Sequence, residues 1–141
     1  MAVELTAPAV QTVQYGGNVL FTDTAVGCNR GYVVHREGAG IVTLRGIGCQ
    51  RARYKVTFGG NIAIPTGGTV EAITAALAIN GEPLTSATAT VTPAAVENYF
   101  NIYVSAQVCV PKGCCLTVAM ENTSTQAVNF ANSNLTVERI A

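Results

Sequence analysis

The chain has 141 residues, of which 49% are hydrophobic and only 11% are charged, and eight Lys and Arg residues balance eight Asp and Glu residues. This length allows one domain whose core needs no metal or disulfide. The neutral balance excludes the basic field that a nucleic-acid partner requires, and no apolar run approaches the ~20 residues of a membrane span. The charged fraction lies well below the ~25% usual for soluble domains, so little charge is available to cover the surface of a monomer.

Short runs rich in Val, Thr and Ala, separated by Gly, Pro and Asn, fill the chain, and no window keeps a helical apolar stripe. This pattern is typical of an all-β protein. The predicted strands, in chain order, are residues 9–15, 18–24, 31–36, 41–45, 51–64, 69–79, 83–92, 99–110, 115–121 and 129–140. Strands of this number and length, joined mostly by short turns, must close into an antiparallel sandwich or a barrel.

Two connections predict hairpins. Residues 37–40 form a short glycine-rich link, and Asn80-Gly81 lies between two apolar runs. Asn-Gly is the strongest short hairpin signal, because both residues tolerate positive φ. Since this turn follows at once, we interpret residues 72–79 as strand, although their Ala and Leu content also suits a helix.

Residues 51–64 are predicted to form a long strand in which Arg53 and Lys55 share one side. The Gly59-Gly60 pair within it predicts a bulge or a close approach of another backbone.

The strand at residues 99–110 has two different sides. One side is apolar and consists of Phe100, Ile102, Val104, Ala106 and Val108. The other side consists of Tyr99, Asn101, Tyr103, Ser105 and Gln107. Two tyrosines mixed with short polar groups, without any charge, are unusual on a solvated face and typical of a face buried against another subunit. We therefore predict a subunit interface here.

The cysteines are five in number and lack paired C-x-x-C spacing; they are Cys28, Cys49, Cys109, Cys114 and Cys115. This pattern argues against a zinc site. The N-terminus has neither a basic stretch nor a continuous apolar stretch of a secretory signal, so we expect production in a cytoplasm and no disulfide framework. The cysteines are then expected to be small buried apolar residues.

The sequence contains no arrangement of residues that suggests catalysis. The single histidine, His35, has only Glu37 as a near carboxylate, and the other carboxylates are scattered singly. Neither a nucleophile with a base nor a pair of carboxylates can be assembled. We predict no catalytic residues, no cofactor, no metal site and no enzyme activity.

Four segments follow one another in an order that is known from one type of fold: RARYKVTFGGNIAI, LAINGEPL, YFNIYVSAQVCVPKGCCLTVAMENTS and ANSNLTVERI. The resemblance that they carry covers residues 52–141, about two thirds of the chain. Their order resembles the jelly roll shared by tumour necrosis factor (TNF) and the complement globular heads. It looks especially like the carboxy-terminal domains of bacterial spore-surface collagen-like proteins, and similar proteins occur in phage virions. This chain departs from the spore proteins in carrying no Gly-X-Y repeat.

The resemblance implies an antiparallel β-sandwich of TNF-like jelly-roll type, with residues 15–141 as its domain. It also implies a homotrimer whose inner sheets pack around a threefold axis, in agreement with the uncharged tyrosine side. In the family's strand order the closing strand lies beside residues 51–64, so that Arg53 or Lys55 would meet Glu138 near the subunit boundary. Residues 1–14 are either an amino-terminal arm, which is a candidate docking segment, or the first strand.

The function expected from these features is structural and non-enzymatic. We predict a trimeric phage virion component, either a capsid decoration or a fibre head, that is assembled in the host cytoplasm and has the major capsid protein or another virion or surface-layer protein as partner. The alternative is a trimeric binding module of a spore or cell surface that recognises carbohydrate or a host protein. Aromatic residues at loop tips would favour this alternative, yet the predicted tips EGAG, PTGG, NGEP and PKGC contain none.

Overall fold

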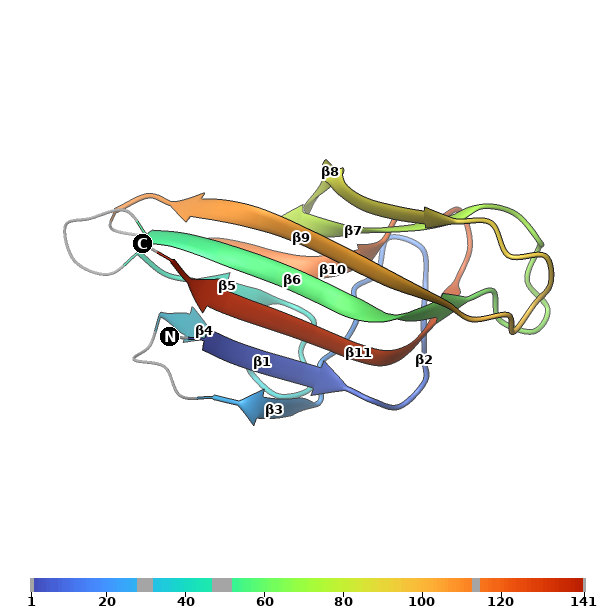
Figure 1. The fold of residues 1–141 in the computed structure, drawn as a ribbon, viewed down its shortest axis with the longest axis horizontal. Helices are drawn as coiled ribbons and strands as arrows, with labels where there is room; N and C mark the ends of the chain where they lie inside the picture. The colour runs from blue at the N-terminus through green and yellow to red at the C-terminus, as the bar shows by residue number, and fades with distance from the viewer. Residues whose placement is uncertain (1, 28–31, 47–51, 113–114, 141) are drawn as a thin grey trace.

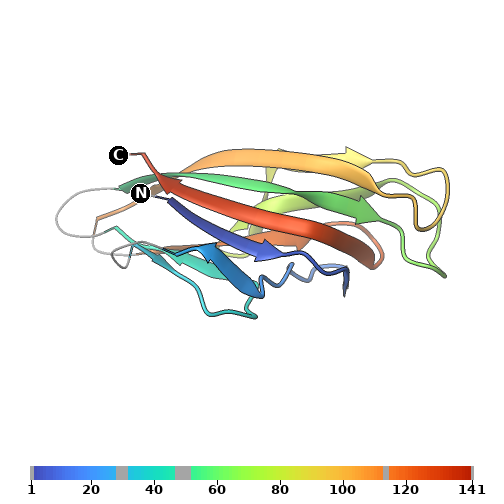
Figure 2. The ribbon, with the colours of Figure 1, turned by 60° about the horizontal axis from the view of Figure 1, so that its bottom comes forward.

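The computed structural model describes residues 2–27, 32–46, 52–112 and 115–140, which form two β-sheets packed face to face. The first, six-stranded sheet has the order β3 (Asp23–Val26), β1 (Ala2–Ala7), β11 (Val128–Arg139), β6 (Ala52–Ala63) and β9 (Phe100–Val110), and β2 (Gln11–Val13) pairs with β11. The second, five-stranded sheet has the order β4 (Val33–Val34), β5 (Val42–Leu44), β10 (Leu116–Asn122), β7 (Ile73–Ile79) and β8 (Glu82–Val91). Figure 1 shows the six-stranded sheet in front, and Figure 2 shows both layers from another side.

The path of the chain is that of a jelly roll. All strand pairs within the two sheets are antiparallel. After β3 the chain changes sheet at every connection except the hairpins β4–β5 and β7–β8. This alternation between two antiparallel sheets confirms the predicted sandwich and its jelly-roll type.

Both predicted hairpins are confirmed. Strands β4 and β5 pair on either side of residues 35–41, and β7 and β8 are joined by Asn80 and Gly81, whose φ angles are 52° and 83°. Positive φ at both central residues is the geometry that this dipeptide favours. Residues 73–79 are strand, which confirms the interpretation chosen over a helix.

The amino-terminal segment differs most from the prediction. The expected strands at 9–15 and 18–24 have wrong bounds, because regular strand forms only in β2 and β3. Residues 2–7 are the first strand, paired with β11 on one side and β3 on the other. The buried side chains of this strand are those of Val3, Leu5 and Ala7. Their period-two spacing is the signal that the sequence reading overlooked.

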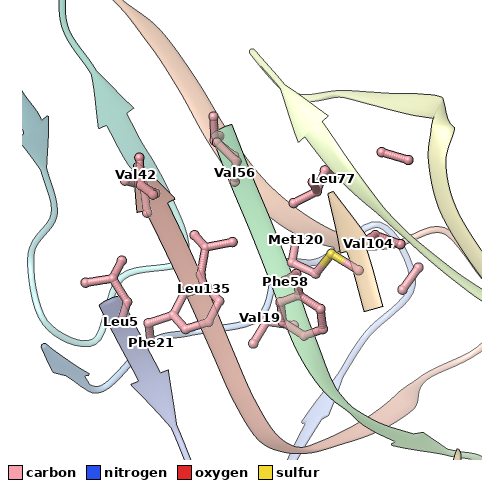
Figure 3. Packing of buried hydrophobic residues seen from close by; sticks show 14 of the residues in the cluster. Leu5, Val19, Phe21, Val42, Val56, Phe58, Leu77, Val104, Met120 and Leu135 are labelled. Carbon is pink, nitrogen blue, oxygen red and sulfur yellow. The ribbon is translucent and has the colours of Figure 1, made fainter. Parts of the chain in front are cut away.

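The core lies between the two sheets and contains a row of aromatic rings. Phe58 lies 6.4 Å from Phe21 and 6.3 Å from Phe130 between ring centroids, both in edge-to-face contact. Each such pair contributes about 0.5–1.5 kcal/mol beyond the area it buries. Phe58 of the first sheet and Met120 of the second belong to the same buried cluster, and both are labelled in Figure 3. Both sheets thus contribute to one core.

Asn122 ties the end of β10 to its surroundings. Its side chain is fully buried, and Nδ2 donates to the carbonyl oxygens of Val13 and Gln126, both at 2.9 Å. Its Oδ1 accepts from the Ser124 amide at 2.9 Å. By contrast, Ser133 on β11 is 2% exposed, and its Oγ has no hydrogen-bond partner among the described residues.

These two residues give a matched test of the core. Asn122→Ala should lower the free energy of unfolding by about 2–3 kcal/mol, because it leaves buried backbone groups unpaired. Ser133→Ala should leave stability unchanged or raise it by up to ~1 kcal/mol, since the hydroxyl is already unpaired. Urea unfolding of the two variants beside the wild type measures both effects. A loss of stability in Ser133→Ala as large as that in Asn122→Ala would contradict this assignment.

Candidate subunit interface

The predicted interface residues lie on the solvent side of the six-stranded sheet. Strand β9 buries alternate side chains, those of Ile102, Val104 and Val108. The side chains between them face outwards, and Tyr103 is 66% exposed. Strand β6 alternates in the same way, with Arg53 and Lys55 facing solvent. We call the solvent-facing side chains of β1, β11, β6 and β9 the outer face.

The register of the strands divides the outer face into rows. Across β11, β6 and β9, one row holds Glu138, Lys55 and Gln107, the next Thr136, Thr57 and Ser105, and the third Asn134, Gly59 and Tyr103. The first row places Lys55 directly opposite Glu138, whereas the other two rows carry no charge. Thr57 Oγ1 and Ser105 Oγ are 3.3 Å apart. Charge on these three strands is therefore confined to the end of the sheet near the two termini, seen on the left in Figure 1.

The structure thus brings the predicted residues of three strands together. Strand β11 does lie beside β6, as the resemblance implied, and Glu138 and Arg53 share the outer face with the β9 residues. Asn101 and Gln107 are exposed, and Tyr99, one residue before β9, is 37% exposed. Phe100 departs from the predicted apolar side, since it is 38% exposed at the start of the strand. Burial of this face against a second copy stays a prediction.

A depression in the outer face was not predicted. It has a volume of about 490 Å³, and its lining includes Gly59 and Gly60 of β6, Thr6 of β1 and Tyr103 of β9. Opposite the glycines, β11 bulges between Ala131 and Asn134. The glycine pair did predict a bulge or a close approach, but the contribution of β1 required the pairing of strands that are far apart in the sequence.

Asparagine side chains form a hydrogen-bonded chain beside this depression. Asn101 Nδ2 donates to Asn61 Oδ1 at 3.1 Å, and Asn61 Nδ2 donates to Asn132 Oδ1 at 3.1 Å. Asn101 Nδ2 also lies 3.3 Å from the Gly60 carbonyl oxygen. These contacts link β9, β6 and the bulge of β11, so the amides are held in place by one another.

The cysteine prediction is wrong where the structure tests it. Cys109 is an exposed free thiol, because it shares the outward parity of Tyr103 and Gln107 on β9. Cys115 is exposed and disulfide-bonded rather than a buried thiol. Cys28, Cys49 and Cys114 lie outside the described residues.

His35 contacts a backbone carbonyl group and an aromatic ring. His35 Nε2 lies 3.0 Å from the Ala39 carbonyl oxygen, and its ring packs edge-on against Phe21. Glu37, the only near carboxylate in the sequence, instead accepts a hydrogen bond from the Thr24 amide at 3.3 Å. Among the described residues, no three His, Cys, Asp or Glu side chains are grouped to hold a metal ion. The same residues include no helix that is long and apolar enough to cross a membrane.

Comparison with solved structures identifies the class of fold. The TNF protein Eiger from S. frugiperda has a TM-score of 0.72 at 12% identity, covering 100% of this chain and 92% of that one. The globular domain of the zebrafish complement 1qA protein has a TM-score of 0.61 at 12% identity, covering 99% and 97%. The PRD1 vertex protein P5 has a TM-score of 0.53 at 15% identity, covering 99% and 96%. The chain therefore has the TNF-like jelly-roll fold, as its sequence motifs implied.

No protein-family model matches this chain, and no curated protein matches it.

A thiol in the uncharged part of the outer face can report whether that face is covered. Ser105 lies in an uncharged row, whereas the natural exposed thiol, Cys109, is paired with Arg53 at the charged end. In a Ser105→Cys, Cys109→Ser variant, a second copy that covers the face should slow labelling by a disulfide reagent about tenfold, since reaction requires access to the thiolate. The measurement is the labelling rate against protein concentration, with Cys109→Ser alone as the control that identifies the signal. A labelling rate that does not fall as the protein concentration rises would contradict the interface.

Proposed function

We propose that this chain is a non-enzymatic structural protein that forms a homotrimer through the outer face of its six-stranded sheet. The observation that carries the proposal is the uncharged part of that face, which combines the 66% exposed Tyr103 with Thr57, Ser105 and Asn101. Aromatic residues are enriched, and charged residues depleted, at the centre of protein interfaces. The charged pair Lys55 and Glu138 lies at one end of the face, where a polar rim is expected.

The size of the face limits how the proposed trimer can be built. Four strands about 4.8 Å apart, with a length of ~40 Å set by the 12 residues of β6, offer roughly 700 Å². A stable interface takes about 800 Å² from each partner, and each subunit of a trimer has two neighbours. The outer face can therefore supply most of one contact, and the trimer must also use neighbouring surface such as the open edge of β9.

The open edge of β9 gives a second reason. Strand β9 ends the six-stranded sheet, and it has 11 residues. It carries no charged side chain and no proline, which are the usual means of protecting an exposed edge. Assembly around a threefold axis would cover this edge.

Solution mass tests the trimer. The wild type should have a mass of about 44 kDa by light scattering, three times the 14.6 kDa of the chain. Tyr103→Glu should reduce it to the mass of one chain, because an unpaired charge buried in the interface is costly. Tyr15→Glu is the matched control, since Tyr15 is 70% exposed and lies off the outer face, so its trimer should persist. A wild type with the mass of one chain would exclude the proposal.

The biological setting that we propose is a virion, with the trimer as a capsid decoration or fibre head. A trimer matches the local threefold symmetry of a capsid, and a vertex protein, PRD1 P5, has the same fold. The disulfide at Cys115 supports a final location outside the reducing cytoplasm where the chain is made. A spore or cell surface would also lie outside the reducing cytoplasm.

Only part of residues 1–14 can serve as the docking segment that we propose. Because residues 2–7 are a core strand, removing them would unfold the sandwich rather than only release it from a partner. The solvent-facing part follows β1, where Val10 is 59% exposed beside Leu20, which is 47% exposed. We place contact with the major capsid protein, or another virion or surface-layer protein, on this part.

Particle fractionation tests this setting. In cells that carry the gene, the protein should sediment with DNA-containing particles in a density gradient. Val10→Asp should keep the trimer but lose the particles, because a charge in an apolar contact is costly. Val70→Asp, at a 51% exposed position elsewhere, is the control and should stay with the particles. Recovery of the wild type on cells or spores, with none in particles, would contradict the virion role.

One observation supports the alternative, a surface module that binds carbohydrate. Tyr15 is 70% exposed in the turn that it forms with Gly16, so one loop tip does carry an aromatic ring. Exposed aromatic faces are suited to amphipathic ligands such as sugar rings. The fractionation experiment separates this alternative from the virion role.

A further inference from the structure

The depression in the outer face exists because one row of the sheet lacks a side chain. Gly59 lies between Asn134 on β11 and Tyr103 on β9. A Cβ at Gly59 would be 2.9 Å from Asn134 Oδ1, closer than such atoms approach. The floor is therefore backbone, and the walls are formed by Thr6 and Pro8 on one side and by Asn101 and Tyr103 on the other.

The walls are preformed. The amide of Asn101 is held by Asn61 and by the Gly60 carbonyl oxygen, and Asn134 Nδ2 lies 3.4 Å from Glu4 Oε2. Side chains fixed in this way lose little further freedom when something enters the depression, which lowers the cost of binding. Glu4 is the only charged residue in the lining, and its carboxylate can accept a hydrogen bond from an uncharged donor such as a phenol hydroxyl.

Tyr103 stands beside the depression without filling it. Although Tyr103 is paired with Gly59, its side chain remains 66% exposed, so the ring does not lie flat over the glycine. A tyrosine side chain that enters a site with both apolar and polar walls buries roughly 150–250 Å² of its surface. The ring projects from an edge strand, where a second copy can reach it.

We propose that the depression is the seat of the Tyr103 ring of the next copy of this chain. A projecting group and a hollow at different places on the same chain form a heterologous contact, which closes into a ring when the rotation permits. The depression of about 490 Å³ has room for a phenol ring beside its own Tyr103. This inference rests on the proposed trimer and names the contact that joins its subunits.

Two single variants and their mixture test the seat. Tyr103→Ala removes the ring, and Thr6→Trp fills the hollow from β1, whose Thr6 side chain faces outwards. Each variant alone should raise the concentration at which the trimer dissociates by about tenfold or more. Light scattering measures this concentration, and circular dichroism checks that each chain is folded. Thr6→Phe replaces Thr6→Trp if the larger ring prevents folding.

The mixture is the decisive sample. At a concentration where each variant alone is dissociated, mixing them should restore part of the trimer, because the Tyr103 ring of a Thr6→Trp subunit can enter the unfilled hollow of a Tyr103→Ala subunit. A ring of three always contains at least one contact between like variants, so the mixture should recover less than the double variant. The Tyr103→Ala, Thr6→Trp double variant should also recover, since its indole occupies the vacated seat.

Three results would overturn the inference while leaving the trimer in place. These are a trimer that tolerates both single variants, a double variant that sums the two losses, and a double variant that recovers when the mixture gains nothing over either single variant. The last result would place the ring in its own subunit. If the wild type has the mass of one chain, the proposed trimer fails as well, and light scattering of the wild type alone shows this.

Discussion

The ladder of β11, β6 and β9 is the constraint on which the rest of the structure depends. Strand β6 pairs antiparallel with β11 on one side and with β9 on the other over most of its length. Because side chains alternate across a strand, this pairing directs Tyr54, Val56 and Phe58 into the core. The same register sets the opposite side chains in rows, so the composition of the outer face follows from the core. A slip of one residue would exchange the two faces.

The low charge of this chain bears on the proposed assembly through the outer face. A monomer with 11% charged residues has few charged groups that repel other protein molecules. Assembly through an uncharged sheet face would remove the surface that charge does not protect. Of the charged residues that face outwards, Arg53, Lys55 and Glu138 then lie at the end of the face where solvent remains, whereas Glu4 borders the depression.

Irregular positions, rather than regular strands, shape the candidate contact. The bulge in β11 lies opposite Gly60, where a Cβ would be 3.2 Å from the Ser133 Cα. Asn132 in that bulge has a φ of 54°, a conformation that asparagine tolerates better than most residues. The result is a hollow in an otherwise filled sheet. Bulges of this kind often lie at functional places, because they redirect the neighbouring side chains.

Local patterns in the sequence determined the strands of residues 52–140, both hairpins and the two sides of β9. Period-two alternation and the Asn80-Gly81 turn act over a few residues, and no other part of the chain is needed to read them. The same alternation places Cys109 on the outward side of β9. Only the tertiary structure decided that residues 2–7 pair with β11, that Thr6 and Tyr103 border one hollow, and that Cys115 is disulfide-bonded. Such contacts join residues far apart in the chain, and their energies depend on register, burial and close packing that no short stretch of sequence contains.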